Sequence, residues 1–279
     1  MSYKIVVDSC GELTEAMKQD GHFHTASLSM EVDGVRIVDD ETFDQLEFLK
    51  KVAASPECPK SSCPSPEEYM QSFKGEEEHV YAVTLSAELS GSYNSAELGR
   101  NLYLEEVGEK DIHVFNSRTA SVGETLIAMK IQECEEAGMS FQEVVDTVEA
   151  YIDSQITYFV LETLDTLKKN GRLTGLKALV ASALNIKPVM GSTPEGVICQ
   201  LGQARGIKRA LAKMVDYAME GRSGKVNKTL GIAHCNCPER AEEVRRLLMD
   251  KAEFDSYIIV NTAGISTMYA NDGGIIVVI

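Results

Sequence analysis

Positive charge is scarce in this sequence. The 27 lysines and arginines are outnumbered by 43 aspartates and glutamates, which gives a formal net charge of −16 at pH 7. A protein that binds the phosphate backbone of DNA or RNA usually presents a basic surface, so this balance argues against a nucleic acid partner. The 44% hydrophobic and 25% charged residues are ordinary for a globular protein, and 279 residues suffice for one large or two smaller domains.

Long apolar runs are also missing. No stretch approaches the roughly 20 apolar residues that a membrane-spanning helix needs, and no basic segment followed by an apolar one opens the chain. The seven cysteines are an odd number at irregular spacing, which does not fit a disulfide framework. We therefore expect a cytoplasmic protein, for which transient contact with a membrane remains allowed.

The sequence lacks the common catalytic and nucleotide-binding motifs. It has no phosphate-binding P-loop, no Gly-x-Gly-x-x-Gly after a strand, no Gly-x-Ser-x-Gly, no Ser-x-x-Lys and no His-Glu-x-x-His. His22 and His24 have the spacing of metal ligands on one face of a strand, but a third ligand is missing. His234, Cys235 and Cys237 match no established metal-binding spacing, and cysteines at a strand end usually serve packing. Neither a metal nor a cofactor is predicted.

What the sequence does contain is a turn rich in hydroxyl groups. Residues 80–85 are apolar and β-branched, as in a buried strand, and the segment after residue 93 has the apolar spacing of a helix. A loop that enters a helix directs free backbone N–H groups and hydroxyls to one point, which favours a phosphate or a carboxylate. One serine alone would be an ordinary helix N-cap, but Ser90, Gly91 and Ser92 together indicate a ligand-binding loop.

Similar polar loops recur through the first half of the chain. Predicted strands and helices alternate there, which implies a parallel sheet with right-handed crossovers. Ligands of such sheets bind outside the carboxyl ends of the strands. Four polar loops precede helices and are expected to converge at this edge: Asp8-Ser9, Ser61-Ser62, Ser90–Ser92 and Asn116-Ser117.

The periodicity predicts the remaining elements and a division of the chain. Strands are expected at 4–9, 25–30, 111–117, 157–161, 186–190, 197–201, 228–234, 256–262 and 274–279. Helices are expected at 42–54, 67–73, 120–137, 141–152, 164–169, 176–184, 208–220 and 238–251, the first with Phe43, Leu46 and Leu49 facing the core. Turn residues predict hairpins at Asp33-Gly34 and at 193–196. The pattern changes near residue 155, which predicts an N-terminal parallel-sheet α/β domain (1–155) and a C-terminal α+β domain (156–279).

Arg172 is a candidate for contact with an anion. The segment Lys168-Lys-Asn-Gly-Arg172 places this arginine at a glycine-permitted turn between two predicted helices, from which its guanidinium can reach across to an anion. Capping of the preceding helix by basic residues explains the same segment equally well. The residue spacing alone does not decide between contact with an anion and capping of the helix.

Four segments, in the same order, resemble the DegV family, which includes the FakB fatty acid-binding subunits of bacterial fatty acid kinase. They are Val7-Asp-Ser9, Lys60-Ser-Ser-Cys-Pro-Ser-Pro-Glu-Glu68, Leu89-Ser-Gly-Ser-Tyr-Asn-Ser-Ala96, and Leu167-Lys-Lys-Asn-Gly-Arg-Leu173 with the following Leu184-Asn-Ile-Lys-Pro188. The resemblance implies two α/β domains, the second closing over a long-chain fatty acid held between them. It implies a carboxylate among Ser61, Ser62, Ser90, Ser92 and the backbone of Gly91, with Arg172 nearby.

The resemblance also implies that the chain is not an enzyme. It would present the carboxylate to a partner fatty acid kinase that is similar to dihydroxyacetone kinases. Two alternatives remain: a family member that binds a different small lipid or acid, and an acyl hydrolase that uses Ser90 or Cys63 as nucleophile.

The sequence departs from the family pattern at several positions. Ser61, Cys63 and Asn170 replace a threonine, a glutamine and a glycine. The segment Met268-Tyr-Ala-Asn-Asp-Gly-Gly274 stands where the family has His-Thr-Gly-Pro-Gly. Tyr269 is the residue nearest to the missing histidine, so we expect it to take the histidine's place beside the headgroup.

Overall fold

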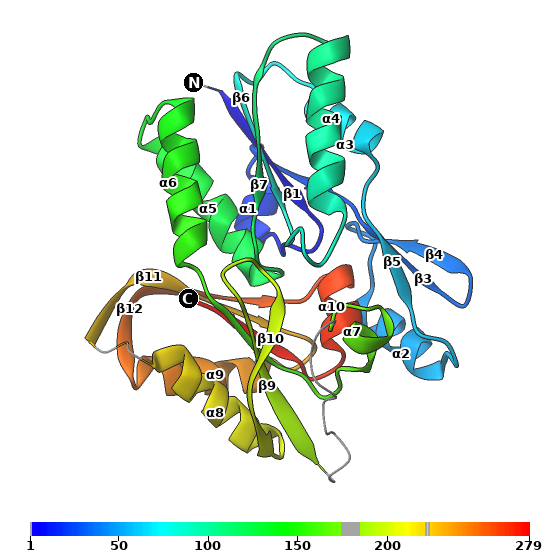
Figure 1. Cartoon of the computed structure of the whole chain (residues 1–279), viewed down its shortest axis with the longest axis vertical. Coiled ribbons are helices and arrows are strands. Elements are labelled where there is room, and N and C mark those ends of the chain that lie inside the picture. The colour runs from blue at the N-terminus through cyan, green and yellow to red at the C-terminus, as the bar shows by residue number, and fades with distance from the viewer. Residues whose placement is uncertain (1, 174–184, 221, 223) are drawn as a thin grey trace.

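The computed structural model describes residues 2–173, 185–220, 222 and 224–279, whose strands form three sheets (Figure 1). The helix predicted at 176–184 lies outside the described residues. None of the helices within the described ranges is long and apolar enough to cross a membrane.

The first large sheet has four parallel strands in the order β2-β1-β6-β7, which confirms the predicted parallel sheet. Its strands are β1 (Tyr3–Asp8), β2 (Phe23–Ala26), β6 (His79–Thr84) and β7 (Asp111–Asn116). Every residue of β1 and β6 is buried, because these central strands are covered on both faces.

Helices cover both faces of this sheet. Val6 and Val80 belong to the apolar cluster that α3 and α4 cover, whereas Ile5 and Val7 belong to the cluster under α1, α5 and α6. Serine N-caps begin α3 and α6, and in each case a glutamate three residues later completes a capping box. These helices are α1 (Glu15–Gln19), α3 (Pro66–Ser72), α4 (Ser92–Glu106), α5 (Val122–Glu136) and α6 (Phe141–Ser154).

The second large sheet has six strands in the order β10-β9-β8-β13-β11-β12. All neighbouring pairs are antiparallel except β11 and β12, which run parallel. The turn at 193–196 joins β9 to β10, as predicted, and Gly196 takes a positive φ of 88° there. The strands are β8 (Thr157–Val160), β9 (Ile186–Ser192), β10 (Ile198–Arg205), β11 (Gly224–His234), β12 (Ala252–Asn261) and β13 (Ile275–Val278).

Helix α5 lies between the two large sheets. One side of α5 packs in the cluster of the first sheet, and Val122 and Leu126 pack on Ala233 and Val278 of the second. The opposite face of the second sheet is covered by α8 (Ile207–Met219) and α9 (Pro238–Met249). Every residue of α5 from Val122 to Ala128 is buried as a result.

The third sheet is small and antiparallel, in the order β4-β3-β5. Its hairpin turns at Asp33-Gly34, as predicted, with positive φ at both residues. Two short helices, at residues 45–54 and 264–270, pack beside it in one apolar cluster. The elements are β3 (Ser29–Val32), β4 (Val35–Val38), β5 (Lys60–Ser62), α2 (Gln45–Ala54), α7 (Asp165–Lys169) and α10 (Gly264–Ala270).

Two predictions about this region were wrong. The single strand expected at 25–30 is two strands of different sheets, because Leu28 leaves the first sheet and pairs with Asp39 and the Ser9 hydroxyl. In α2, Leu46 was expected to face the core but is 52% exposed, and Phe48 is buried instead. Phe43 and Leu49 pack on the apolar clusters as expected. Helix α10 was not predicted at all.

The strands of the two large sheets come from different halves of the chain. The four-stranded sheet ends with β7 and the six-stranded sheet begins with β8, so the expected boundary near residue 155 falls between them. Helix α10, from the second half, packs with α2 and β3 of the first half in one apolar cluster. A division into two domains at this point stays a prediction.

Gly99 on α4 marks a close approach to α3. A Cβ atom at this position would lie 2.6 Å from the Pro66 carbonyl oxygen and 2.7 Å from Tyr69 Cβ. We expect Gly99→Ala to lower the free energy of unfolding by about 1–3 kcal/mol through overpacking, despite the better helix propensity of alanine. Gly21→Ala is the control, because nothing lies within 4 Å of its Cβ position. Equal urea midpoints for the two variants would contradict the close contact.

Candidate functional site

An apolar pocket lies between the loops of the first sheet and the face of the second. The surface that its lining exposes is almost wholly apolar. Both halves of the chain contribute side chains to it: Leu85 and Leu89 from the first half, and Phe159, Leu161, Ile198 and Ile276 from the second. A concave site with an apolar surface suits a molecule with a large hydrocarbon part.

Polar groups gather where Arg172 and Tyr269 line this pocket. The Arg172 guanidinium lies 5.7 Å from the centre of the Tyr269 ring, and the Tyr269 hydroxyl lies 2.9 Å from Ser61 Oγ. Arg172 also donates hydrogen bonds to the carbonyl oxygens of Leu89 and Asn170, which leaves further N–H groups of its guanidinium for an anion. The structure thus joins three of the seven predicted site residues in one contact network.

The other predicted residues, like Ser61, do not line the pocket themselves. Ser62 Oγ hydrogen-bonds to Ser29 Oγ at 2.8 Å, and Ser90 Oγ accepts the Ser92 N–H at 3.2 Å. Gly91 is exposed and begins α4 as its N-cap, with Cys63 Sγ 3.5 Å from the position of a Cβ. Direct contact of these residues with a ligand stays a prediction.

Ser92 has a structural partner in Asp8. The Ser92 hydroxyl is fully buried and donates a 2.7 Å hydrogen bond to Asp8 Oδ2, so the Tyr69 hydroxyl, 2.6 Å away, donates to Ser92. Asp8 also accepts the N–H groups of Leu85 and Cys10. One carboxylate at the end of β1 therefore holds both ends of the loop 85–92.

Further buried carboxyl groups position the C-terminal part of the site. Asp39 accepts the Gly264 and Ile265 N–H groups at 2.7 and 2.8 Å, which fixes the start of α10 and thereby Tyr269. Glu12 accepts the Ser121 hydroxyl at 2.8 Å. Burial raises the pKa of Asp39 to about 6 and that of Glu12 to about 7. One signal for Glu12 was present in the sequence, since it lies close after the strand predicted at 4–9.

The candidate nucleophiles lack a base. Burial raises the pKa of the Cys63 thiol, which disfavours the reactive thiolate. Among the described residues, no histidine hydrogen-bonds to Cys63 or Ser90. The geometry therefore does not favour an acyl hydrolase.

The two histidine clusters considered from the sequence have other contacts. His22 stacks on Tyr3 with 4.1 Å between ring centres, and its Nδ1 lies 2.6 Å from Asp20. His234 accepts the Cys237 N–H. Neither set belongs to the one group of close ligand atoms found in the described part of the chain, which is Asp8, Cys10 and Glu124.

Comparisons with known proteins bear on the whole chain. The sequence model of the DegV family, described as a family of uncharacterised proteins, matches residues 2–278. A DegV domain-containing protein of Streptococcus pneumoniae is 31% identical over 278 residues, which cover 99% of this chain and 98% of that protein.

Two solved structures are similar over the full length. A DegV family protein of Ruminococcus gnavus, refined with vaccenic acid, is 61% identical with a TM-score of 0.97, and the match covers 100% of both chains. The Streptococcus pneumoniae Fatty Acid Kinase (Fak) B3 protein, loaded with linoleic acid, is 32% identical with a TM-score of 0.86, covering 100% of this chain and 99% of that one. These matches confirm the fold class predicted from the sequence.

Glu12 gives the stability of the protein a defined dependence on pH. Its pKa is about 7 in the folded state against an ordinary value of 4.5, so the folded state binds more protons between these values. The stability that this group contributes is therefore present below about pH 4.5 and lost as the pH rises through 7. As the pH rises from about 4 to about 8, the wild-type protein pays for ionising the buried Glu12, whereas glutamine cannot ionise. We therefore expect the unfolding free energy of Glu12→Gln minus that of wild type to increase by about 3 kcal/mol over this range.

Urea unfolding across this pH range measures the effect. Glu41→Gln, at an exposed carboxylate, is the control and should follow the wild-type curve. Parallel curves for Glu12→Gln and wild type would contradict the raised pKa.

Proposed function

The chain belongs to the DegV family, and we therefore propose that it binds a long-chain fatty acid in the apolar pocket between its two halves, residues 1–155 and 156–279. The almost wholly apolar lining of this pocket is the observation that carries the proposal. The fatty acids bound by the relatives of 61% and 32% identity support it. Burial of each methylene contributes roughly 0.8 kcal/mol, so the acyl chain supplies most of the affinity.

The carboxylate of this ligand lies at the polar group formed by Ser61, Tyr269 and Arg172. Arg172 supplies the positive charge, and the two hydroxyls supply neutral donors. We expect Ser62, Ser90 and the backbone of Gly91 to contribute further polar contacts to the headgroup, whereas the Ser92 hydroxyl supports the loop through its hydrogen bond to Asp8. Tyr269 takes the position in which the family has a histidine.

The protein acts as a binding subunit, not as an enzyme. Neither Cys63 nor Ser90 has a hydrogen-bonded histidine among the described residues, so a bound carboxylate would not meet an activated nucleophile. The relative that is a fatty acid kinase B protein supports the next step, in which a partner kinase phosphorylates the presented carboxylate.

Native mass spectrometry of the purified protein, with analysis of an organic extract, tests the ligand class. We expect a bound mass that matches a fatty acid of the producing cell. A protein that is purified empty and stays empty after fatty acids are added would overturn the proposal. A different bound acid would show that the same pocket serves another ligand.

A variant of Arg172 distinguishes a role in binding the headgroup from a structural role. We expect Arg172→Met to weaken fatty acid binding about tenfold, which corresponds to roughly 1.4 kcal/mol for one lost charged contact. Arg209→Met, at an exposed arginine of α8, is the control and should bind like wild type. Fluorescence displacement of a bound fatty acid probe measures the affinities.

Thermal unfolding of the same variants tests the alternative role. If the melting temperature of Arg172→Met falls well below that of wild type while that of Arg209→Met does not, the arginine serves chiefly to cap the segment after α7. Unchanged affinity in a folded Arg172→Met protein would contradict the headgroup contact.

A further inference from the structure

The side chains of β8 that line the apolar pocket show in which direction it runs. Thr157 and Phe159 of β8, and Leu161 directly after it, all line the pocket, because alternate side chains of a strand lie on the same face. Leu161 packs in the same apolar cluster as Tyr269, at the polar end of the pocket. Thr157 begins the strand and lies about 13 Å from Leu161, since a strand rises roughly 3.3 Å per residue. A ligand whose carboxylate lies beside Arg172 therefore extends its far end toward Thr157.

Hydrogen bonds join the two halves of the chain at the Thr157 end of the pocket. Thr157 Oγ1 lies 2.6 Å from Thr119 Oγ1, in the loop after β7, and the Thr157 N–H donates to Ser192 Oγ of β9 at 3.2 Å. Ser86, from the loop after β6, donates a 2.9 Å hydrogen bond to the Gly196 carbonyl oxygen in the turn between β9 and β10. All of these residues except Ser86 line the pocket, so the bonds lie in its wall.

The turn between β9 and β10 packs against the first half without leaving room for a side chain. Gly196 has a positive φ of 88°, and a Cβ atom there would lie 2.7 Å from Arg118 Cα and 2.9 Å from the Arg118 carbonyl oxygen. The Arg118 side chain forms ion pairs with Glu149 and Asp153 of α6, at 3.3 and 2.6 Å. Its guanidinium is thus engaged with α6, and close backbone contact closes the pocket at this point.

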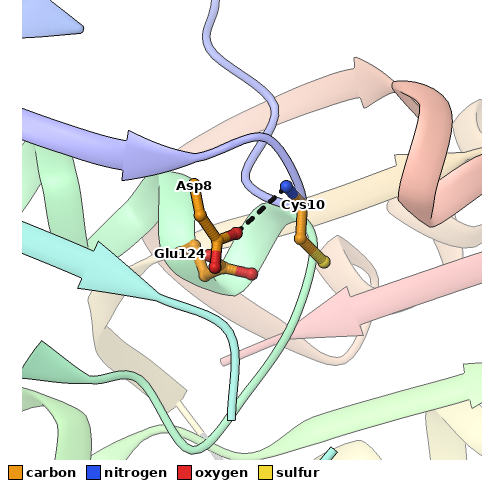
Figure 2. A group of neighbouring side chains, drawn as sticks. All are labelled: Asp8, Cys10 and Glu124. Atoms are coloured by element: carbon orange, nitrogen blue, oxygen red, sulfur yellow. Dashed lines mark hydrogen bonds between the residues drawn. The ribbon is translucent and has the colours of Figure 1, made fainter. Parts of the chain in front are cut away.

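The wall between the two ends is fixed as well. Cys10 lines the pocket, donates its N–H to Asp8 Oδ1 at 3.1 Å, and has its Sγ 3.8 Å from Ser266 Oγ. Glu124 of α5 lies beside Asp8 and Cys10, and all three residues are buried (Figure 2). Since buried side chains are packed about as densely as in organic crystals, this wall does not yield to a longer ligand. The length of the bound chain therefore depends on the Thr157 end.

The hydroxyl groups at the Thr157 end are used by the protein itself. Thr157 donates to Thr119 Oγ1, which in turn donates to the Ala120 carbonyl oxygen at 3.4 Å. The pocket lining exposes almost only apolar surface, so the two threonines present their methyl groups to a ligand. A terminal methyl group fits such a surface, whereas a terminal hydroxyl or carboxylate would be buried without a partner.

We propose that the Thr119–Thr157 pair forms the end wall of the pocket and selects acids with an unsubstituted alkyl end of limited length. The inference specifies the tail of the ligand, so it rests on the proposed fatty acid binding. Each methylene that enters the pocket raises the affinity about fourfold. A methylene beyond the end wall brings no such gain, because it would have to part the two threonines and their hydrogen bond.

Affinities of the wild-type protein test whether this end is closed. Palmitic acid is compared with its ω-hydroxy derivative by displacement of a fluorescent fatty acid probe from the delipidated protein. We expect the ω-hydroxy acid to bind at least about tenfold more weakly, because its hydroxyl is buried without a partner. Equal affinities would show that the far end of the chain reaches water, and the end wall would be disproved.

Variants of the threonine pair test what limits the length. For a series of saturated acids that differ by one carbon atom, we expect Thr157→Ala to move the best-bound length upward by about two carbon atoms, because two side-chain atoms are removed. Thr157→Val is the matched control, since it retains the size of the side chain without the hydroxyl. It should keep the wild-type optimum, although its melting temperature falls because Thr119 loses its partner.

Thr119→Ser provides a second opening of the wall if Thr157→Ala fails to fold. It removes one methyl group and keeps the hydroxyl, so the optimum should move by about one carbon atom. A folded variant that binds acids with the wild-type optimum would refute the role of the pair and leave fatty acid binding untouched. Wild-type protein that binds no acid of any length would instead refute the proposed function, and the end wall with it.

Discussion

The Asp8 carboxylate is the interaction on which the candidate site depends. It accepts three hydrogen bonds, which tie the end of β1 to the loop after β6 and to the first residue of α4. Burial raises its pKa, so the protein accepts an electrostatic cost to keep a polar anchor between apolar elements. The serine-rich loop is ordered from behind by this anchor, and Ser92, one of its hydroxyls, is used entirely for that purpose.

The position of α5 explains why a pocket forms beside this anchor. Because α5 lies between the two large sheets, the loops at the carboxyl ends of β1, β6 and β7 face β8 and α10 across the apolar pocket. Apolar side chains from both halves line this pocket. The buried helix therefore brings the hydroxyl-rich edge of one sheet against the apolar face of the other.

The local pattern of apolar and turn residues was sufficient to predict the parts of the fold that depend on contacts between neighbours in sequence. The parallel sheet followed from alternating strands and helices, and the Asp33-Gly34 hairpin from its turn residues. Contacts between distant residues were not predictable. Asp39 caps a helix 225 residues away, and α10 has only seven residues, too few to show a helical period. The complete burial of Glu124 was equally hidden, because a glutamate in a helix usually faces solvent.

Tyr269, which we propose stands where the family has a histidine, defines the polar end of the pocket together with Ser61 and Arg172. A histidine there would change its charge near neutral pH, whereas burial raises the pKa of the Tyr269 hydroxyl from an already high value, so it stays neutral. The ring also provides a face for the Arg172 guanidinium at 5.7 Å and a hydroxyl for Ser61. Arg172 is then the sole charged residue of the network that it forms with Ser61 and Tyr269, and a carboxylate held there would be bound equally well across the neutral range of pH.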